Sequence, residues 1–168
     1  MVSTKFDLRY NSNIGFATDQ GGRGFQHPSD LVMRPSDGKI FVASRGVGPT
    51  IGVQMVSRDF EFFGKVSSSG SEAGQMSQPS ALAFDYAENL YVADENLNRI
   101  SVFNPEGDFL RSWGVKGSAD GEFDNPSGLL VLGDVLFVVD TMNHRIQKYD
   151  LDGKYIGAWG SEGSDKSQ

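Results

Sequence analysis

The chain has 168 residues, of which 38% are hydrophobic and 22% charged, so its composition is that of an ordinary globular protein that can bury a core. The absence of cysteine excludes disulfide frameworks, thiolate zinc sites and cysteine nucleophiles. The formal net charge of −7 argues against a nucleic-acid partner, because affinity for phosphates comes largely from clustered Lys and Arg.

The first residues predict neither an export signal nor a membrane segment. Residues 1–10 carry charges where a signal peptide would need an apolar run, and no stretch approaches the roughly 18 apolar residues of a membrane helix. We therefore expect a cytoplasmic protein with no membrane partner.

Residues 4–17 predict a β-hairpin. Two short apolar segments, 4–10 and 14–17, flank a turn at 11–13 and align with residues 145–159 near the other end of the chain. The alignment indicates the outer half of a unit like the one at residues 145–159, in a half unit that covers residues 1–18.

The rest of the chain contains a repeat of about fifty residues. A Pro-Ser pair opens each unit at Pro28, Pro79 and Pro126, and a Gly-containing polar segment precedes each pair. We expect three units, over residues 24–66, 74–114 and 121–160, followed by a tail over 161–168.

Each unit contains four predicted strands. After the opening apolar run, β-branched and aromatic residues mark a second, a third and a fourth strand, with Gly-bearing turns between them. These predicted strands are residues 39–44, 51–56 and 61–66 in the first unit, 89–94, 99–103 and 109–114 in the second, and 135–140, 145–149 and 155–160 in the third. The fold class is therefore all-β, a partial propeller of four-stranded antiparallel blades.

The repeats resemble the NHL family, in which a proline, a strand ending in Asp, an Asn-His-Arg turn and a third strand follow one another. The third unit has Pro126, Asp140 and Asn143-His144-Arg145, and the second has Pro79, Asp94 and Asn98-Arg99. The first unit departs from the pattern, with residues 43–50 in place of the Asp and the turn. The resemblance implies about half of a six-bladed propeller, in a family whose members include protein-binding, RNA-binding and hydrolytic or lyase propellers.

Three blades and a half are fewer than the four to eight of closed propellers, which leaves apolar blade faces uncovered. We expect the chain to associate with itself, as a dimer in preference to other states, although the hairpin over residues 4–17 has no obvious place in a twofold ring of six blades.

His144 is the residue that most suggests catalysis, since it lies beside Asp140 and Arg145. The equivalent turn in the second unit has Asn98, so we interpret His144 as part of a structural turn and assign no catalytic residue. Asp94 and Asp140 end strands just before these turns, where a carboxylate can accept backbone hydrogen bonds.

The irregular segment 44–50 in the first unit is a candidate ligand loop, because loops that depart from a repeat often carry function. Arg45 would lie at one end of the central channel that the blades of a propeller surround, among Asp94, Glu95 and Asp140. There it could form a salt bridge between blades or bind a ligand carboxylate. The candidate rim residues for binding a protein or small polar ligand are Arg45, Asp94, Glu95, Asp140 and His144.

Metal binding is the alternative. The two histidines occupy unlike repeat positions, so a histidine cluster is not expected, and no cofactor is assigned. Oxygen-only Ca²⁺ binding by Asp30, Asp94 and Asp140 is left open. The predicted function is a non-enzymatic binding module or scaffold; the alternative is a metal-dependent hydrolase or lyase that is active only when the ring is complete.

The aromatic residues at the ends of the outer strands predict packing between blades. Trp113 and Trp159 match each other, and Phe63 is expected at the matching place in the first unit.

Overall fold

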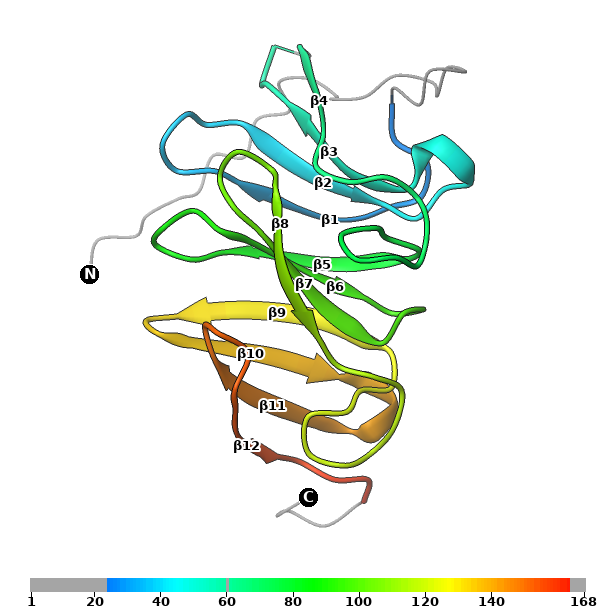
Figure 1. The fold of residues 1–168 in the computed structure, drawn as a ribbon, viewed down its shortest axis with the longest axis vertical. Coiled ribbons are helices and arrows are strands. Elements are labelled where there is room, and N and C mark those ends of the chain that lie inside the picture. The colour runs from blue at the N-terminus through cyan, green and yellow to red at the C-terminus, as the bar shows by residue number, and fades with distance from the viewer. Residues whose placement is uncertain (1–23, 60, 164–168) are drawn as a thin grey trace, which may run out of the picture.

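The computed structural model describes residues 24–59 and 61–163, which form three four-stranded antiparallel sheets. Figure 1 shows them as three layers, with the first sheet uppermost and the third lowest. The predicted partial propeller of four-stranded antiparallel blades is confirmed. The predicted hairpin over residues 4–17 lies outside the described residues.

In each sheet the strand order follows the chain, so every blade is a meander. Blade 1 contains β1 (Pro28–Met33), β2 (Ile40–Ser44), β3 (Gly52–Val56) and β4 (Phe62–Lys65). Blade 2 contains β5 (Pro79–Phe84), β6 (Leu90–Asp94), β7 (Arg99–Phe103) and β8 (Phe109–Trp113). Blade 3 contains β9 (Pro126–Leu132), β10 (Val135–Asp140), β11 (Arg145–Asp150) and β12 (Tyr155–Trp159). Two single-turn 3₁₀ helices, η1 (Gly48–Thr50) and η2 (Thr141–Asn143), follow β2 and β10.

The first strand of each blade begins at its proline, on an edge of the sheet where the missing N–H is tolerated. The pairing with the second strand is irregular next to the proline in all three blades. The register there sets the proline opposite the last residue of the second strand, Ser44, Asp94 or Asp140. The repeat therefore positions one polar side chain per blade at the same end of the stack.

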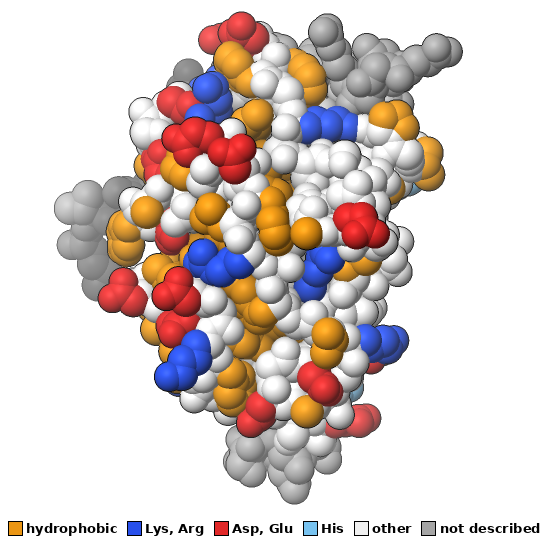
Figure 2. All heavy atoms as spheres, viewed as in Figure 1, with side chains coloured by type: hydrophobic (Ala, Val, Ile, Leu, Met, Phe, Trp, Pro, Cys, Tyr) orange, Lys and Arg blue, Asp and Glu red, His pale blue; other side chains and the backbone are white. Residues whose placement is uncertain are grey.

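Charged side chains of both signs are interspersed over the face shown in Figure 2, with apolar side chains between them. Among residues 24–59 and 61–163, no helix is long and apolar enough to cross a membrane.

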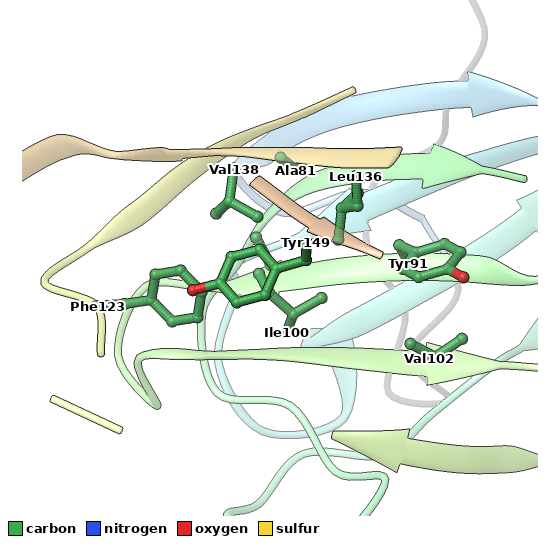
Figure 3. Packing of buried hydrophobic residues seen from close by; sticks show 9 residues of the cluster. Ala81, Tyr91, Ile100, Val102, Phe123, Leu136, Val138 and Tyr149 are labelled. Atoms are coloured by element: carbon green, nitrogen blue, oxygen red, sulfur yellow. The ribbon is translucent and has the colours of Figure 1, made fainter. Parts of the chain in front are cut away.

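The middle blade is covered on both sides, and every residue of β6 is buried. We call the side of a blade that carries Ala81 in blade 2 its front face, and the opposite side, which carries Leu82, its back face. The front face of blade 2 packs against the back face of blade 3 in one cluster, in which the Phe123 and Tyr149 rings lie 5.7 Å apart. Figure 3 shows these rings beside Ile100 of β7 and Val138 of β10.

The second cluster repeats this arrangement one blade earlier. Phe41 and Val53 of the blade 1 front face pack against Leu82 and Phe103 of the blade 2 back face. The front of one blade thus always meets the back of the next, and burial of these side chains is the main favourable contribution to the fold.

One aromatic prediction was wrong. In the register of β7 and β8, Trp113 lies opposite Ile100. The equivalent residue of blade 1 is Val66, whose N–H donates to the Val53 carbonyl, whereas Phe63 is 40% exposed beneath the Lys39 ammonium. Blade 2 has the same bulge at the equivalent place, and Phe62 pairs with Val56 as Phe109 pairs with Phe103. Phe63 therefore corresponds to Leu110, three positions before the counterpart of Trp113.

Alanine substitutions at two equivalent glycines test the packing between blades 2 and 3. Gly107 and Gly153 occupy equivalent turns with φ of +91° and +90°. A Cβ on Gly107 would meet nothing within 4 Å, whereas one on Gly153 would lie 2.6 Å from Cε3 of Trp113. We expect Gly107→Ala to lower the free energy of unfolding by about 1–2 kcal/mol through backbone strain alone. Gly153→Ala should cost about 1–3 kcal/mol more, because the methyl group overpacks the interface.

Urea denaturation of both variants measures the difference. Equal losses for the two would contradict the close packing of Trp113 on blade 3.

Candidate functional site

The candidate site is the end of the stack at which the second strands finish and the first strands begin. We call it the rim, and it consists of residues 26–28 and 45–50 in blade 1, 77–79 and 95–98 in blade 2, and 124–126 and 141–144 in blade 3. All five candidate binding residues lie on the rim or at the strand ends beside it.

Asp94 is buried and organises the rim of blade 2. Its carboxylate accepts backbone N–H bonds from Ser77 at 2.7 Å and Gln78 at 3.1 Å, in the segment that precedes β5. It also accepts the N–H groups of Asn96 at 3.1 Å and Leu97 at 2.9 Å in the turn that follows β6. The expected role of Asp94 as an acceptor of backbone bonds is confirmed, and it ties the start of the blade to its own turn.

Asp140 occupies the same place in blade 3 and is fully buried. It accepts the backbone N–H of Asp124 at 2.7 Å, but its other partners are side chains: Nδ2 of Asn143 at 2.9 Å, Nε of Arg145 at 2.8 Å and Nε2 of Gln147 at 2.9 Å. The buried charge is therefore paired and hydrogen-bonded, as a carboxylate in an apolar interior requires.

The polar network continues below Asp140 through Tyr149. The Tyr149 hydroxyl donates to Oε1 of Gln147 at 2.9 Å, and Gln147 in turn donates to Asp140. Burial raises the pKa of Tyr149, an effect that the charge of Arg145 opposes. The phenol therefore stays protonated at neutral pH and acts as a donor that orients Gln147.

Two arginines that the sequence analysis did not select hold the linkers between blades. Arg145 donates to the carbonyls of Ser118, Ala119 and Glu122 at 2.8–2.9 Å. Arg99 makes the equivalent bonds in blade 2, to the carbonyls of Ser71, Glu72 and Gln75 at 2.8–3.0 Å. Their shared place after the strand-ending Asp was visible in the sequence, but the carbonyl targets lie more than twenty residues earlier in the chain.

Blade 1 lacks the arginine that binds the linker carbonyls in the other two blades. Gly52 stands where the other blades have the arginine, since it pairs with Ser44 as Arg99 pairs with Asp94. The η1 turn replaces the Asn-containing turn, and the Thr50 hydroxyl lies 2.9 Å from Oε1 of Gln26. The irregular loop is therefore anchored to the opening of its own blade.

Arg45 forms a salt bridge between blades. Its Nη2 lies 2.9 Å from Oε1 of Glu95, and its Nε donates to the Pro79 carbonyl at 3.3 Å. The Arg45 side chain is 32% exposed and that of Glu95 is 19% exposed. Of the three carboxylates expected near Arg45, the structure pairs it with Glu95, because Asp94 and Asp140 turn toward their own blades.

His144 lies in the left-handed region with φ of +53° and ends η2. Asn98 has a φ of +50° at the equivalent turn of blade 2. His144 is exposed and, together with Thr141 and Trp159, lines an open cavity of about 360 Å³ beside blade 3. It lies two blades away from Arg45.

The weak metal candidates are not gathered together. Asp30 uses Oδ1 to accept the N–H of Leu31 and Oδ2 to accept the N–H of Leu82 in blade 2, both at 2.8 Å. Within the described ranges, no group of three or more His, Cys, Asp or Glu side chains is arranged to hold a metal ion.

Removing the Asp140 carboxylate should destabilise the fold, because it leaves the positive charge of Arg145 without its partner. We expect Asp140→Ala to lower the free energy of unfolding by about 3–5 kcal/mol, because Arg145, whose side chain is 12% exposed, loses its counter-charge.

The matched control is Asp152→Ala. The Asp152 side chain is 93% exposed and lies 3.6 Å from Arg111, so its loss should leave the unfolding midpoint unchanged. Urea denaturation compares the two variants, and a small effect of Asp140→Ala would contradict the role given to this carboxylate.

Solved structures resemble this chain in fold. Hydrazine synthase of Kuenenia stuttgartiensis aligns with a TM-score of 0.62 at 19% identity, over 91% of this chain and 40% of that one. A nidogen/laminin complex aligns with a TM-score of 0.63 at 16% identity, over 81% of this chain and 48% of that one. Virginiamycin B lyase from Staphylococcus aureus, crystallised with quinupristin, aligns with a TM-score of 0.61 at 13% identity, over 86% of this chain and 43% of that one.

These structural similarities show the propeller fold and nothing about activity. The chain spans less than half the length of each of these three structures. No curated protein matches it in sequence. The family described as 6-bladed beta-propeller matches residues 71–159, which is more than half of the chain. The chain therefore belongs to the 6-bladed beta-propeller family.

Proposed function

We propose that this chain is a non-enzymatic propeller module of the NHL type, which binds a protein or a small polar ligand at its rim and associates to complete the ring. The observation that carries the proposal is the partly exposed Arg45–Glu95 salt bridge, which spans two blades on a rim where the strand-ending carboxylates of Asp94 and Asp140 accept hydrogen bonds from within the protein.

The NHL assignment is supported by what the motif residues do. In blade 3 the strand-ending Asp140 binds both Asn143 and Arg145 of the Asn-His-Arg turn. In blade 2, Asp94 binds the backbone of the corresponding turn, and Arg99 makes the same kind of linker contacts as Arg145. The motif residues thus act as a structural unit, which agrees with a family defined by its repeat.

The rim is better suited to binding than to acid–base chemistry. A general acid or base must be able to exchange a proton with a substrate at hydrogen-bonding distance. Asp94 and Asp140 are buried, and both oxygens of each carboxylate accept bonds from within the protein.

Arg45 and Glu95 are rim charges that a ligand can reach, because both side chains are partly exposed. A guanidinium has five N–H donors in a planar fork that fits a carboxylate. Arg45 directs Nε and Nη2 toward Pro79 and Glu95. A ligand carboxylate would share Arg45 with Glu95 or displace it, so an acidic peptide side chain or a small carboxylate is the ligand class that fits.

A titration with succinate, followed by amide chemical shifts, tests this binding. We expect the shifts to concentrate at residues 45–50 and 95. Arg45→Gln should abolish them, whereas Glu95→Gln should strengthen binding because it removes the internal competitor of the ligand. Arg58→Gln, which changes an exposed arginine away from the rim, is the matched control and should bind as the unmodified chain does.

Elemental analysis of the purified protein checks the non-enzymatic assignment. A stoichiometric divalent metal would count against it, and shifts that are insensitive to Arg45→Gln would refute the proposed binding residue.

A further inference from the structure

Both interfaces between described blades are built in the same way, which makes the outer face of blade 3 informative. The strand register places Gly128, Val139 and Ile146 of blade 3 where blade 2 has Ala81, Ala93 and Ile100 of its front face. Trp159 likewise corresponds to Trp113. Blade 3 therefore has the residues of a front face that receives another blade.

This face is exposed in the described part of the chain. Leu130 is 57% exposed, Leu132 is 64% exposed and Trp159 is 49% exposed. Trp113, the counterpart of Trp159, packs against the Tyr149 ring of the following blade at 5.7 Å. An apolar face with these side chains in water marks an interaction surface.

The complementary surface is on blade 1. Leu31 and Met33 lie on the back side of β1 and are 65% and 46% exposed. Their counterparts in β5, Leu82 and Phe84, pack into the cluster between blades 1 and 2. Pro28 is also exposed, whereas Pro79 and Pro126, which open the next two blades, are buried.

A repeated hydrogen bond gives an independent indication of the same contact. The Ser29 hydroxyl donates to the carbonyl of Pro79 in the next blade at 2.7 Å. The Ser80 hydroxyl donates to the carbonyl of Pro126 in the next blade at 2.6 Å. Ser127, the third serine of this series, instead contacts the Thr141 hydroxyl within its own blade.

We propose that the front face of blade 3 packs against the back face of blade 1 in a second copy of this chain, with Ser127 donating to the carbonyl of Pro28 of that copy. The proposal rests on the association included in the proposed function and specifies its surfaces. The described residues of two copies supply six blades, the number that describes the family. A twofold rotation forms both contacts at once and closes the ring.

Light scattering of the unmodified chain at micromolar concentration is the first test. The expected mass is twice the 18.3 kDa of one chain. Leu130→Asp and Leu31→Lys should each halve that mass, because either change puts a charge into both copies of the interface. Leu110→Asp, on the outer strand of the middle blade, changes an equally apolar residue that is 45% exposed and should leave the mass unchanged.

Mixing the two variants, each of which should be monomeric by itself, tests which two faces are in contact. In a mixed pair, one interface joins the introduced Asp to the introduced Lys and the other has both native leucines, so equimolar Leu130→Asp and Leu31→Lys should recover the doubled mass. Contact between two copies of the blade 3 face would not be rescued in this way.

A mass of one chain for the unmodified protein, a mass above two chains, or a mixture that stays at one chain overturns the proposal. The first measurement needs no variant, so misfolding of a variant does not leave the proposal untested. A single-chain protein that still binds succinate at Arg45 would overturn the ring and leave the rim function standing. A doubled mass without succinate binding would support the ring and overturn the proposed binding at the rim.

Discussion

The packing of one blade on the next is the constraint from which the rest of this structure follows. A four-stranded sheet with apolar side chains on both faces cannot be stable in water alone, because neither face has a core to cover it. Blade 2 satisfies this requirement on both sides, and its strand β6 is entirely buried. Large side chains from the linkers complete each interface: Met76 fills the cluster between blades 1 and 2, and Phe123 fills the one between blades 2 and 3.

The polar rim is a consequence of the same repeat. Stacking the blades requires each linker to leave one outer strand and return to the next inner strand, which exposes backbone carbonyls and N–H groups that need partners. Asp94 and Asp140 satisfy the N–H groups at the blade openings, and Arg99 and Arg145 satisfy the linker carbonyls. Blade 1 has Gly52 in place of such an arginine; there Nε2 of Gln54 donates to the Gly24 carbonyl, and Gln26 accepts the Val47 N–H. The residues that resemble the NHL pattern thus serve largely as hydrogen-bond partners of the backbone.

The sequence was sufficient to predict the blades because alternation, turn glycines and the Pro-Ser openings all repeat at the same spacing. Predicted and observed strand limits agree within one or two residues, as for residues 51–56 against β3. The acceptor role of Asp94 followed from its position before a turn, since that interaction is local. The partners of Arg145 were missed because they depend on the path of the linker. The match of Trp113 to Val66 was missed because Phe63, like Trp113, is an aromatic residue followed by glycine, whereas Val66 is neither.

The rim and the blade interface meet at one atom, the carbonyl oxygen of Pro79. It accepts the Ser29 hydroxyl, which belongs to the packing of blade 1 on blade 2, and also Nε of Arg45, which belongs to the rim. A carbonyl has two lone pairs, so both bonds can coexist. A ligand that draws the guanidinium toward itself would weaken the longer of the two, at 3.3 Å, and leave the 2.7 Å serine bond in place. The serine bond would thus hold the two blades together at this point while Arg45 moved, which agrees with the proposed exchange of an internal carboxylate for an external one.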